Sequence, residues 1–213
     1  MTTGADRPRP RFARFYERMT VDMDRQGLAA LRTELLAGLR GEVVEIGCGN
    51  GRNVPHYPNP VTAVYAIEPE PYLRKLATQA ATTAAVPVEV APGRGEALPL
   101  ADHAVDAAVL CLVLCAMPDP DRTLAEIMRV LRPGGRLVFL EHTLAAGRVL
   151  RVAQCVADAT VWPRLYGGCR TARDPVGSIR TAGFRVEQHR YLHYPERPMV
   201  PASPHVLGRA SRP

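Results

Sequence analysis

The chain has 213 residues, of which 46% are hydrophobic and 23% charged, a composition ordinary for a soluble globular protein with a sizeable core. Its formal net charge is +6, but no RNP, zinc-finger or helix-turn-helix signature accompanies the basic residues, so we predict no nucleic-acid partner. No apolar run reaches the roughly 18 residues that a membrane helix needs, and therefore no membrane span is predicted.

The beginning of the chain and the cysteines suggest a compartment. The first residues are polar and rich in proline and arginine, unlike a secretory signal or a membrane anchor. The five cysteines are odd in number and form no C-x-x-C pair, so we expect free thiols and a cytoplasmic location. We predict that residues 1–10 are a disordered tail and that residues 11–213 form a single domain.

A long helical pattern comes first. A helix over residues 11–39 is predicted from the spacing of its leucines, Leu28, Leu31, Leu35 and Leu36. Gly38 and Gly41 end this pattern, so residues 11–40 are expected to form a helical cap. Short apolar strands are then predicted at residues 42–47, 63–68, 86–91, 105–114 and 136–142.

Helical segments separate most of these strands. They are expected at residues 53–56, 71–84 and 121–131, whereas the third gap has room only for a loop. A longer helical segment follows the fifth strand and carries the only tryptophan; we expect an acceptor-side insertion at residues 143–175. A further helix ends at Gly183, and two last strands start at Phe184 and Pro204. Apolar strands alternating with helices predict an α/β fold with a Rossmann-like, mostly parallel sheet.

Three glycines follow the first strand at alternate positions, Gly47, Gly49 and Gly51. In such a sheet, ligands bind at the carboxyl ends of the strands. Gly47 and Gly49 permit unusual backbone angles, and we expect Gly51 to let the backbone approach a ligand. A dinucleotide site has the spacing G-x-G-x-x-G, but here Arg52 stands at the place of the last glycine. The alternative is a tight turn without a ligand.

Two carboxylates lie near this loop. Glu68 ends the second strand, where a carboxylate can accept hydrogen bonds from both hydroxyls of a ribose. Glu45 lies inside the first strand, where an unpaired charge is costly, so we expect it to pair with loop amides or with an amine of a ligand. Together with the loop, they predict a nucleotide-containing ligand.

The segments VVEIGCGNG, EALPL and VLRPGGRLVFLEH, in this order and spacing, resemble the class I S-adenosylmethionine-dependent methyltransferases. The resemblance runs from about Phe12 through the last strand. It implies the Rossmann-like fold of that class, the cofactor S-adenosyl-L-methionine and the product S-adenosyl-L-homocysteine. Many relatives have an aspartate where Arg94 stands, so Glu96 or a backbone carbonyl is expected to accept from the adenine amino group. The implied cofactor-binding residues are Tyr16, Glu45, Gly47, Cys48, Gly49, Asn50, Gly51, Asn53, Glu68, Pro69, Arg94, Gly95, Glu96, Cys111 and Leu112.

Further segments resemble the small-molecule methyltransferases that include the membrane-associated alkyl thiol S-methyltransferases of animals. These segments are GRNVPHYP, the stretch around Cys115, and LYGGCRTARDPVGSIRTAGF. The resemblance implies methyl transfer by in-line displacement to a small, fairly apolar acceptor, favouring a thiol. Because the chain lacks the animal anchor, a soluble bacterial relative in secondary metabolism is expected. The alternatives within the class are C- or O-methylation of a quinone or phenol, and phospholipid N-methylation.

Two other classes of protein fit the sequence less well. An NAD-dependent oxidoreductase is disfavoured because Gly51 breaks the dinucleotide spacing and Lys75, the sole lysine, forms no Tyr-x-x-x-Lys dyad. A non-catalytic cofactor binder is disfavoured because the glycine loop and Glu68 are intact. We therefore expect an enzyme that acts as a monomer or weak homodimer.

The acceptor side is the less defined part of the predicted site. His142 and Cys115, at the ends of the fifth and fourth strands, are the candidate catalytic residues. Cys111, Cys115 and His142 could together ligate a metal, but only their spacing suggests it, so no metal site is predicted. The predicted acceptor-binding residues are Met19, Cys115, His142, Trp162, Tyr166 and Arg173, and Cys169 is expected in the same pocket wall.

Overall fold

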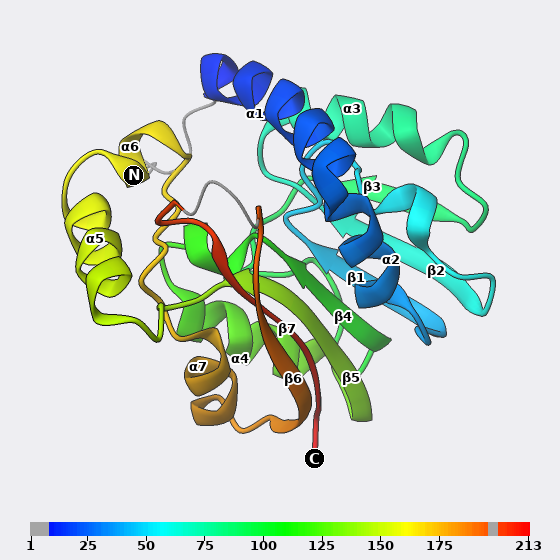
Figure 1. Ribbon diagram of the computed structural model, residues 1–213. Coiled ribbons are helices and arrows are strands. Elements are labelled where there is room, and N and C mark those ends of the chain that lie inside the picture. The colour runs from blue at the N-terminus through cyan, green and yellow to red at the C-terminus, as the bar shows by residue number, and fades with distance from the viewer. Residues whose placement is uncertain (1–8, 196–199) are drawn as a thin grey trace, which may run out of the picture.

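The computed structural model describes residues 9–195 and 200–213, and within them a seven-stranded sheet lies between two layers of helices (Figure 1). The strands are β1 Gly41–Ile46, β2 Val61–Ile67, β3 Val88–Ala91, β4 Val105–Cys111, β5 Leu131–His142, β6 Arg185–His193 and β7 Pro204–Ser211. The α-helices are α1 Pro10–Met23, α2 Ala29–Leu36, α3 Pro71–Ala81, α4 Pro120–Val130, α5 Arg148–Ala159, α6 Trp162–Leu165 and α7 Pro175–Thr181. Short helical turns are η2 Asp24–Leu28, η3 Val54–His56 and η4 Leu114–Ala116.

The strand order is β3-β2-β1-β4-β5-β7-β6, with β7 antiparallel to both its neighbours and the pairs from β3 to β5 parallel. Strands β1 and β4 are central and almost wholly buried, which requires the apolar runs seen in the sequence. Helices α2 and α3 pack on one face, and α4 and α7 on the other. The predicted Rossmann-like α/β fold is therefore confirmed.

The strand order indicates which edge of the sheet can bind a ligand. It reverses between β1 and β4, because the chain runs outward from β1 to β3 and then returns to β4 on the other side. The carboxyl ends of β1, β2, β4 and β5 lie at the same edge of the sheet. A crevice at this reversal is where open α/β sheets bind ligands.

The predicted boundaries differ most from the structure at three places. The single helix predicted over residues 11–39 is broken at Gly27, whose φ of 112° is not helical and divides the cap into α1 and α2. Strand β5 begins at Leu131 instead of residue 136, and the Pro-Gly-Gly turn forms an irregularity within it, where Gly134 has a φ of +74°. Helix α1 begins at Pro10, inside the predicted tail, and residues 1–8 of that tail lie outside the described residues.

The insertion is held against the sheet by the side chains of the buried Gln154 and the half-buried Asp158. Gln154 on α5 donates to the carbonyls of Thr143 and Thr171 and accepts from the amide of Ala145. Asp158, one turn further along, accepts from the amides of Thr171 and Ala172. These bonds hold the segment after α6 against the end of β5, so the insertion has a fixed place beside the sheet edge.

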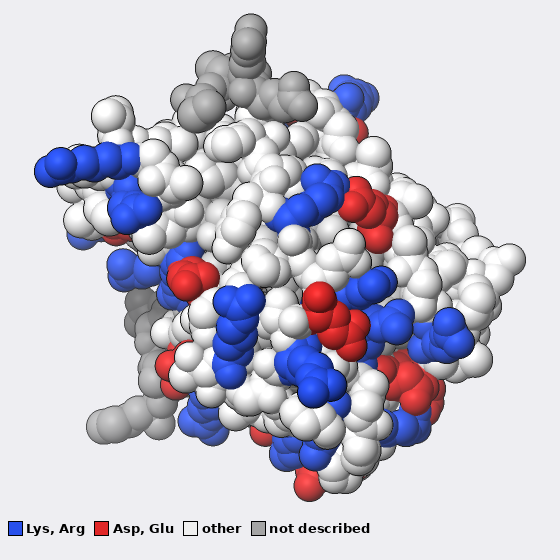
Figure 2. Space-filling view, turned by 60° about the horizontal axis from the view of Figure 1, so that its bottom comes forward, with Lys and Arg blue, Asp and Glu red and all other residues white. Residues whose placement is uncertain are grey.

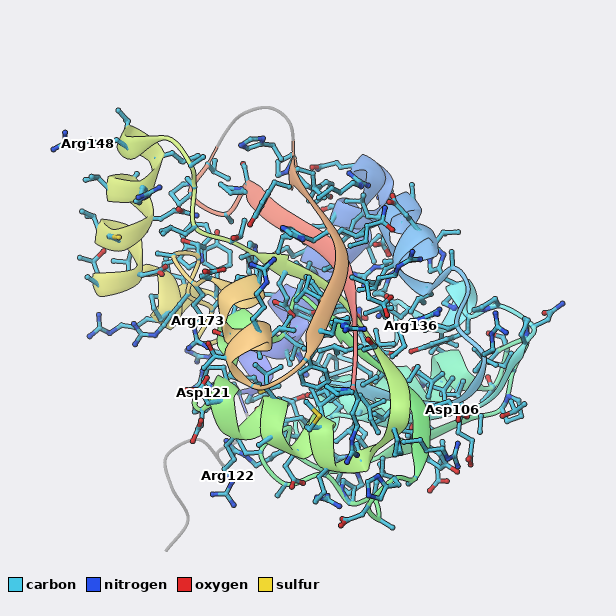
Figure 3. All side chains as sticks on the ribbon, turned by 90° about the horizontal axis from the view of Figure 1, so that it is seen from below. Asp106, Asp121, Arg122, Arg136, Arg148 and Arg173 are labelled. Carbon is cyan, nitrogen blue, oxygen red and sulfur yellow. The ribbon has the colours of Figure 1, made fainter. Side chains whose placement is uncertain are left out.

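The surface carries interspersed charges. On the face shown in Figure 2, basic and acidic side chains are interspersed among neutral ones. Arg129 pairs with Asp102 and with Glu126. Figure 3 shows Arg148 projecting outward from the start of α5, whereas Arg173 lies closer to the body of the molecule. No helix in residues 9–195 and 200–213 is long and apolar enough to cross a membrane.

Candidate functional site

A cavity of about 870 Å³ lies at the carboxyl ends of the strands. The ends of β1, β2, β4 and β5 form its floor, and α1 and α6 form its roof. The roof is held together by contact between α1 and the insertion: the rings of Phe15 and Tyr166 meet edge to face at 6.1 Å, and Phe12 lies against Gly167. The helical cap and the insertion therefore enclose a space of the size that small-molecule sites have.

The glycine loop after β1 forms one end of the cavity, the glycine-loop end. Gly47 and Gly49 have φ values of +64° and +56°, a region that residues with a Cβ rarely adopt. A Cβ at Gly47 would lie 2.3 Å from Val113, and one at Gly49 would lie 3.1 Å from the Tyr16 ring. Both glycines line the cavity, so the loop backbone itself forms part of its wall.

Gly51 has a different part from the one predicted. A Cβ there would lie 3.0 Å from the backbone of Ala77 on α3, and Gly51 does not line the cavity. Its φ of +78° and the close helix explain the glycine without any ligand. The expectation that Gly51 brings the backbone close to a ligand is therefore wrong, and the residue serves the packing of α3 on the loop.

Glu68 lies at the cavity wall where β2 ends. Its two carboxylate oxygens accept from the amides of Gly49 and Glu70, both at 2.9 Å. Burial raises the pKa of Glu68 from its ordinary value, and the two amide bonds oppose that rise. The carboxylate is thus held in place by the glycine loop, with unused lone pairs at the cavity.

The loop after β3 forms the next part of the wall, with Arg94, Gly95 and Glu96 lining the cavity. Glu96 lies 3.6 Å from Arg94 in an ion pair, yet its Oε1 atom is buried and has no hydrogen-bond partner. Buried polar atoms are almost always paired in proteins. This atom is therefore an acceptor suited to a donor group of a ligand.

Behind the glycine loop lies a buried polar network. Glu45 accepts from the Asn53 side-chain amide at 2.8 Å and from the Tyr57 hydroxyl at 2.7 Å. Asn53 in turn accepts from Arg32 at 2.8 Å, and Arg32 also donates to Asp24 at 3.0 Å. Glu45 therefore pairs with two side chains and not, as expected, with loop amides or a ligand amine.

Several predicted cofactor residues lie in this second layer instead of the cavity lining. Asn50 donates to Thr20 on α1, Cys111 accepts from Arg32 at 3.2 Å, and Cys48 is buried against α2 and α3. They connect the loop to the helical cap and support the wall from behind. The predicted cofactor residues outside the cavity lining are Glu45, Cys48, Asn50, Gly51, Asn53 and Cys111.

The other predicted residues do line the cavity. At the glycine-loop end these are Tyr16, Gly47, Gly49, Glu68, Pro69, Arg94, Gly95, Glu96 and Leu112. At the opposite end they are Met19, Cys115, His142, Trp162, Tyr166 and Arg173. Leu112 has a φ of 57°, an uncommon conformation for a residue with a branched side chain, directly after β4.

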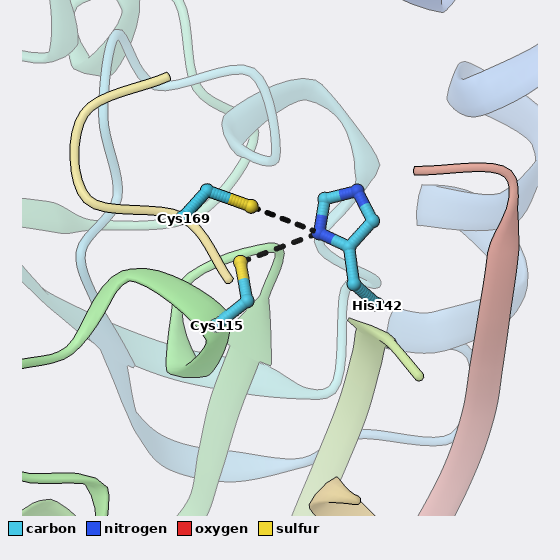
Figure 4. Close-up of side chains that lie close together, drawn as sticks. All are labelled: Cys115, His142 and Cys169. Carbon is cyan, nitrogen blue, oxygen red and sulfur yellow. Dashed lines mark hydrogen bonds between the residues drawn. The ribbon is translucent and has the colours of Figure 1, made fainter. Parts of the chain in front are cut away.

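A cluster of two thiols and an imidazole lies at the opposite end (Figure 4). His142 ends β5, Cys115 lies in η4 and Cys169 lies in the segment after α6. The Nδ1 atom of His142 is 3.3 Å from the Cys115 sulfur and 3.6 Å from the Cys169 sulfur. The structure thus brings Cys169, and not the predicted Cys111, to His142 and Cys115.

The cluster is electrostatically coupled. The hydrogen bond between the two thiols lowers the pKa of Cys169, and the contact with His142 lowers it further, although burial opposes both. The same hydrogen bond, together with burial, raises the pKa of Cys115. Burial opposes the charged form of His142, but its contacts with Cys169 and the nearby Glu141 raise its pKa above the ordinary value. These contacts therefore favour the thiolate form of Cys169 over that of Cys115.

Glu141 supports the cluster from below. Its buried carboxylate accepts from the amides of Val113 and Leu114 at 3.0 and 2.9 Å, so it holds the turn that carries Cys115. Burial raises the pKa of Glu141 to about 7. Arg173 fixes the same turn from the other side by donating to the carbonyls of Leu114 and Met117.

The wall around the cluster is aromatic and apolar. The rings of Trp162 and Tyr166 stack at 4.2 Å, and Met19 on α1 also faces the cavity. His205 on β7 lies with its ring 4.5 Å from that of His142, and its Nδ1 atom is 2.8 Å from the Ser203 carbonyl. The other nitrogen of His205, Nε2, is buried without a partner.

Two residues of this end were not among the predicted ones: Glu141 and His205. Cys169 was expected in the wall of the acceptor pocket, and the structure adds its contact with His142. Glu141 is a charged residue inside an apolar strand, a signal comparable to that of Glu45. His205 gave no signal, because its position beside His142 depends on the pairing of β5 with β7.

Comparisons with known proteins identify relatives of this chain. A family profile described as "Methyltransferase domain" matches residues 44–139. The human thiol S-methyltransferase TMT1B is 35% identical over 183 residues, which cover 82% of this chain and 73% of that protein. The human thiol S-methyltransferase TMT1A is 32% identical over 212 residues, covering 93% of this chain and 85% of that protein.

A solved structure shares the fold. It is an S-adenosylmethionine-dependent methyltransferase from Thermotoga maritima, with a TM-score of 0.68 and 23% sequence identity. The match covers 95% of this chain and 97% of that one. Almost the whole chain, including cap and insertion, therefore follows an arrangement found in a crystal structure.

Proposed function

Because the chain belongs to the class I S-adenosylmethionine-dependent methyltransferases and resembles their thiol S-methyltransferases over most of its length, we propose that it methylates thiols. The acceptor would be a small and fairly apolar thiol. The observation that carries this proposal is the cluster of Cys115, His142 and Cys169, which lies at the same end of the cavity as Trp162, Tyr166 and Met19.

The glycine-loop end fits the cofactor. Glu68 offers fixed carboxylate oxygens for two ribose hydroxyls, and the buried Oε1 atom of Glu96 offers an acceptor for the adenine amino group. Gly47 and Gly49 bring the loop backbone to the cavity wall, and Tyr16 lies over the loop from α1. When bound, S-adenosyl-L-methionine supplies an electrophilic methyl group on a sulfonium.

The residues at the other end have distinct tasks. Trp162, Tyr166 and Met19 surround the acceptor with apolar surface and exclude water, which favours an in-line approach of the acceptor sulfur. His142 lines the cavity at this end, where its imidazole can take the proton of the acceptor thiol. Glu141 and Arg173 hold the Cys115 turn and thereby position that group.

The cavity volume supports a two-ligand site. At about 870 Å³ it is near the upper end of the range for small-molecule pockets, roughly 300–1,000 Å³, so it has room for a nucleoside cofactor and a small acceptor together. The same volume admits a quinone or a phenol, so C- or O-methylation remains the second candidate. Phospholipid N-methylation is the third, and the acceptor assay that closes the Discussion separates them.

Replacing Glu68 by alanine is expected to weaken binding of S-adenosyl-L-methionine by about 1 kcal/mol or more, because charge-assisted hydrogen bonds to the ribose are lost. This corresponds to about a fivefold or larger rise in Kd. Titration calorimetry of both proteins, with S-adenosyl-L-methionine and with NAD, measures it.

The matched control is Glu89→Ala, which removes an exposed carboxylate from the neighbouring strand β3 and should leave Kd unchanged. Unchanged affinity in Glu68→Ala would refute the ribose assignment. Binding of NAD in place of S-adenosyl-L-methionine would refute the proposed cofactor site as a whole.

A further inference from the structure

The cluster of Cys115, His142 and Cys169 has the composition of a metal centre. Its three donor atoms, two sulfurs and one imidazole nitrogen, all lie within 4.8 Å of one another. Thiolate sulfur and imidazole nitrogen are the donors that Zn²⁺ takes in proteins, and Cys₂His is a known three-ligand set for catalytic zinc. No carboxylate belongs to the group, which disfavours the hard cations Mg²⁺ and Ca²⁺.

The separations of the donors match those around zinc. Zinc–sulfur bonds are about 2.3 Å and zinc–nitrogen bonds about 2.1 Å, so tetrahedral geometry places a sulfur and a nitrogen ligand about 3.6 Å apart. The Nδ1 atom of His142 is 3.3 Å from one sulfur and 3.6 Å from the other. Both sulfur–nitrogen separations are therefore within a few tenths of an ångström of those in a tetrahedral zinc site.

The three donors come from segments that are held in place independently of any metal. His142 ends the buried strand β5. The turn of Cys115 is fixed by Glu141 and Arg173, and the amide of Arg170 donates to the Cys115 carbonyl at 2.9 Å, joining the two cysteine segments. A site whose ligands are positioned in advance loses little conformational entropy when the ion binds.

We propose that Cys115, His142 and Cys169 bind one Zn²⁺ with its fourth coordination position open to the cavity. All three residues line the cavity, so the open position faces the space assigned to the acceptor. This proposal replaces the expectation from the sequence that no metal is bound. It rests on the proposed function for one point only, that the fourth ligand is the sulfur of the acceptor thiol.

Zinc coordination releases the protons of the thiol ligands. Zinc binds two thiolates, so any protons still on the Cys115 and Cys169 sulfurs leave to solvent as the bonds form. An acceptor thiol that takes the fourth position loses its proton in the same way and becomes a zinc-bound thiolate. In the zinc-loaded protein, the metal thus does for the acceptor what His142 would do as a base in the metal-free protein.

The test uses the full chain, reduced with a phosphine, freed of metal by a chelator and then titrated with Co²⁺, a spectroscopic substitute for Zn²⁺. We expect about one ion per chain, a thiolate-to-cobalt charge-transfer band and the intense visible bands of tetrahedral coordination. Zn²⁺ should displace the Co²⁺ and abolish these bands. An apolar alkyl thiol, but not the corresponding alcohol, should shift them.

Variants identify the ligands. Cys169→Ala and Cys115→Ala should each weaken zinc binding by more than about 100-fold, since loss of even an outer partner of a ligand costs 10- to 100-fold. Cys155→Ala, at an exposed cysteine of α5, is the matched control and should bind zinc like the original chain. Circular dichroism and binding of S-adenosyl-L-methionine report whether each variant is folded.

The site would be disproved if the reduced protein bound no Co²⁺ or Zn²⁺, or if binding survived in folded Cys169→Ala. Its failure is distinguishable from failure of the proposed function. Methylation of thiols by a protein that binds no zinc would overturn the metal site alone. Zinc binding without thiol methylation would contradict the proposed function and support the site.

Discussion

Arg32→Ala is expected to lower the free energy of unfolding by about 3–5 kcal/mol, because it removes the cation from a buried network and leaves its partners unpaired. The Arg32 side chain is only 5% exposed and donates to Asp24, Asn53 and Cys111. Its neighbours raise the pKa of Arg32 further although burial opposes the charge, so the guanidinium is charged at every working pH. Denaturation with urea, followed by circular dichroism, measures the loss.

The consequence reaches the candidate site. Asn53 connects Arg32 to Glu45 on β1, and Asp24 connects it to Arg52 directly after the glycine loop. We therefore expect weaker binding of S-adenosyl-L-methionine as well as lower stability. Arg25→Ala is the matched control, since Arg25 forms an ion pair with Asp22 in which the side chains are 76% and 65% exposed. Such exposed pairs contribute about 0–1 kcal/mol. An equal effect of the two substitutions would contradict this account of the network.

His142→Ala is expected to lower kcat for an alkyl thiol by about 10²–10⁴-fold, the usual contribution of a positioned acid or base. The loss is expected whether His142 takes the thiol proton or ligates the zinc ion, because either way the acceptor sulfur is no longer activated. Binding of S-adenosyl-L-methionine should be unchanged, since Glu68 directly follows β2, and β2 is separated from β5 by β1 and β4.

A comparison of two acceptor thiols shows whether kcat falls in His142→Ala because the acceptor sulfur is no longer activated. An aromatic thiol has a lower pKa than an alkyl thiol and is largely a thiolate at neutral pH, so its kcat should fall much less in His142→Ala. His189→Ala is the control, because His189 lies on β6 outside the cavity lining and should leave both rates unchanged. Steady-state kinetics with both thiols measure this. Equal losses for both acceptors would show that His142 supports the structure and does not activate the acceptor.

The sheet could be predicted because its strands are buried on both faces. Val43, Val44 and Ile46 of β1, and the apolar residues of β4, leave no alternation and therefore indicate a covered parallel strand. The break in the helical cap could not be predicted in the same way. Gly27 lies within a continuing helical pattern. Its φ of 112°, which divides α1 from α2, cannot be read from the residue types around it.

The site was predictable where its residues are local in sequence. Gly47, Gly49 and Glu68 follow consecutive parallel strands, and such strand ends must meet at one edge. The roles of Cys169 and His205 depend on contacts between distant segments, namely the return of the insertion to η4 and the antiparallel pairing of β7 with β5. Gly51 shows the opposite error: a glycine in a ligand-binding pattern serves the packing of a helix.

The central claim, transfer of a methyl group to a thiol, is tested most directly by a competition assay. The protein is incubated with methyl-labelled S-adenosyl-L-methionine and an equimolar mixture of an alkyl thiol, a phenol, a quinone, a primary amine and phosphatidylethanolamine, and the products are identified by mass spectrometry. We predict that the label is found on the thiol sulfur, with the highest kcat/KM for apolar thiols. Label on a phenol, quinone or amine, with none on the thiol, would contradict the account.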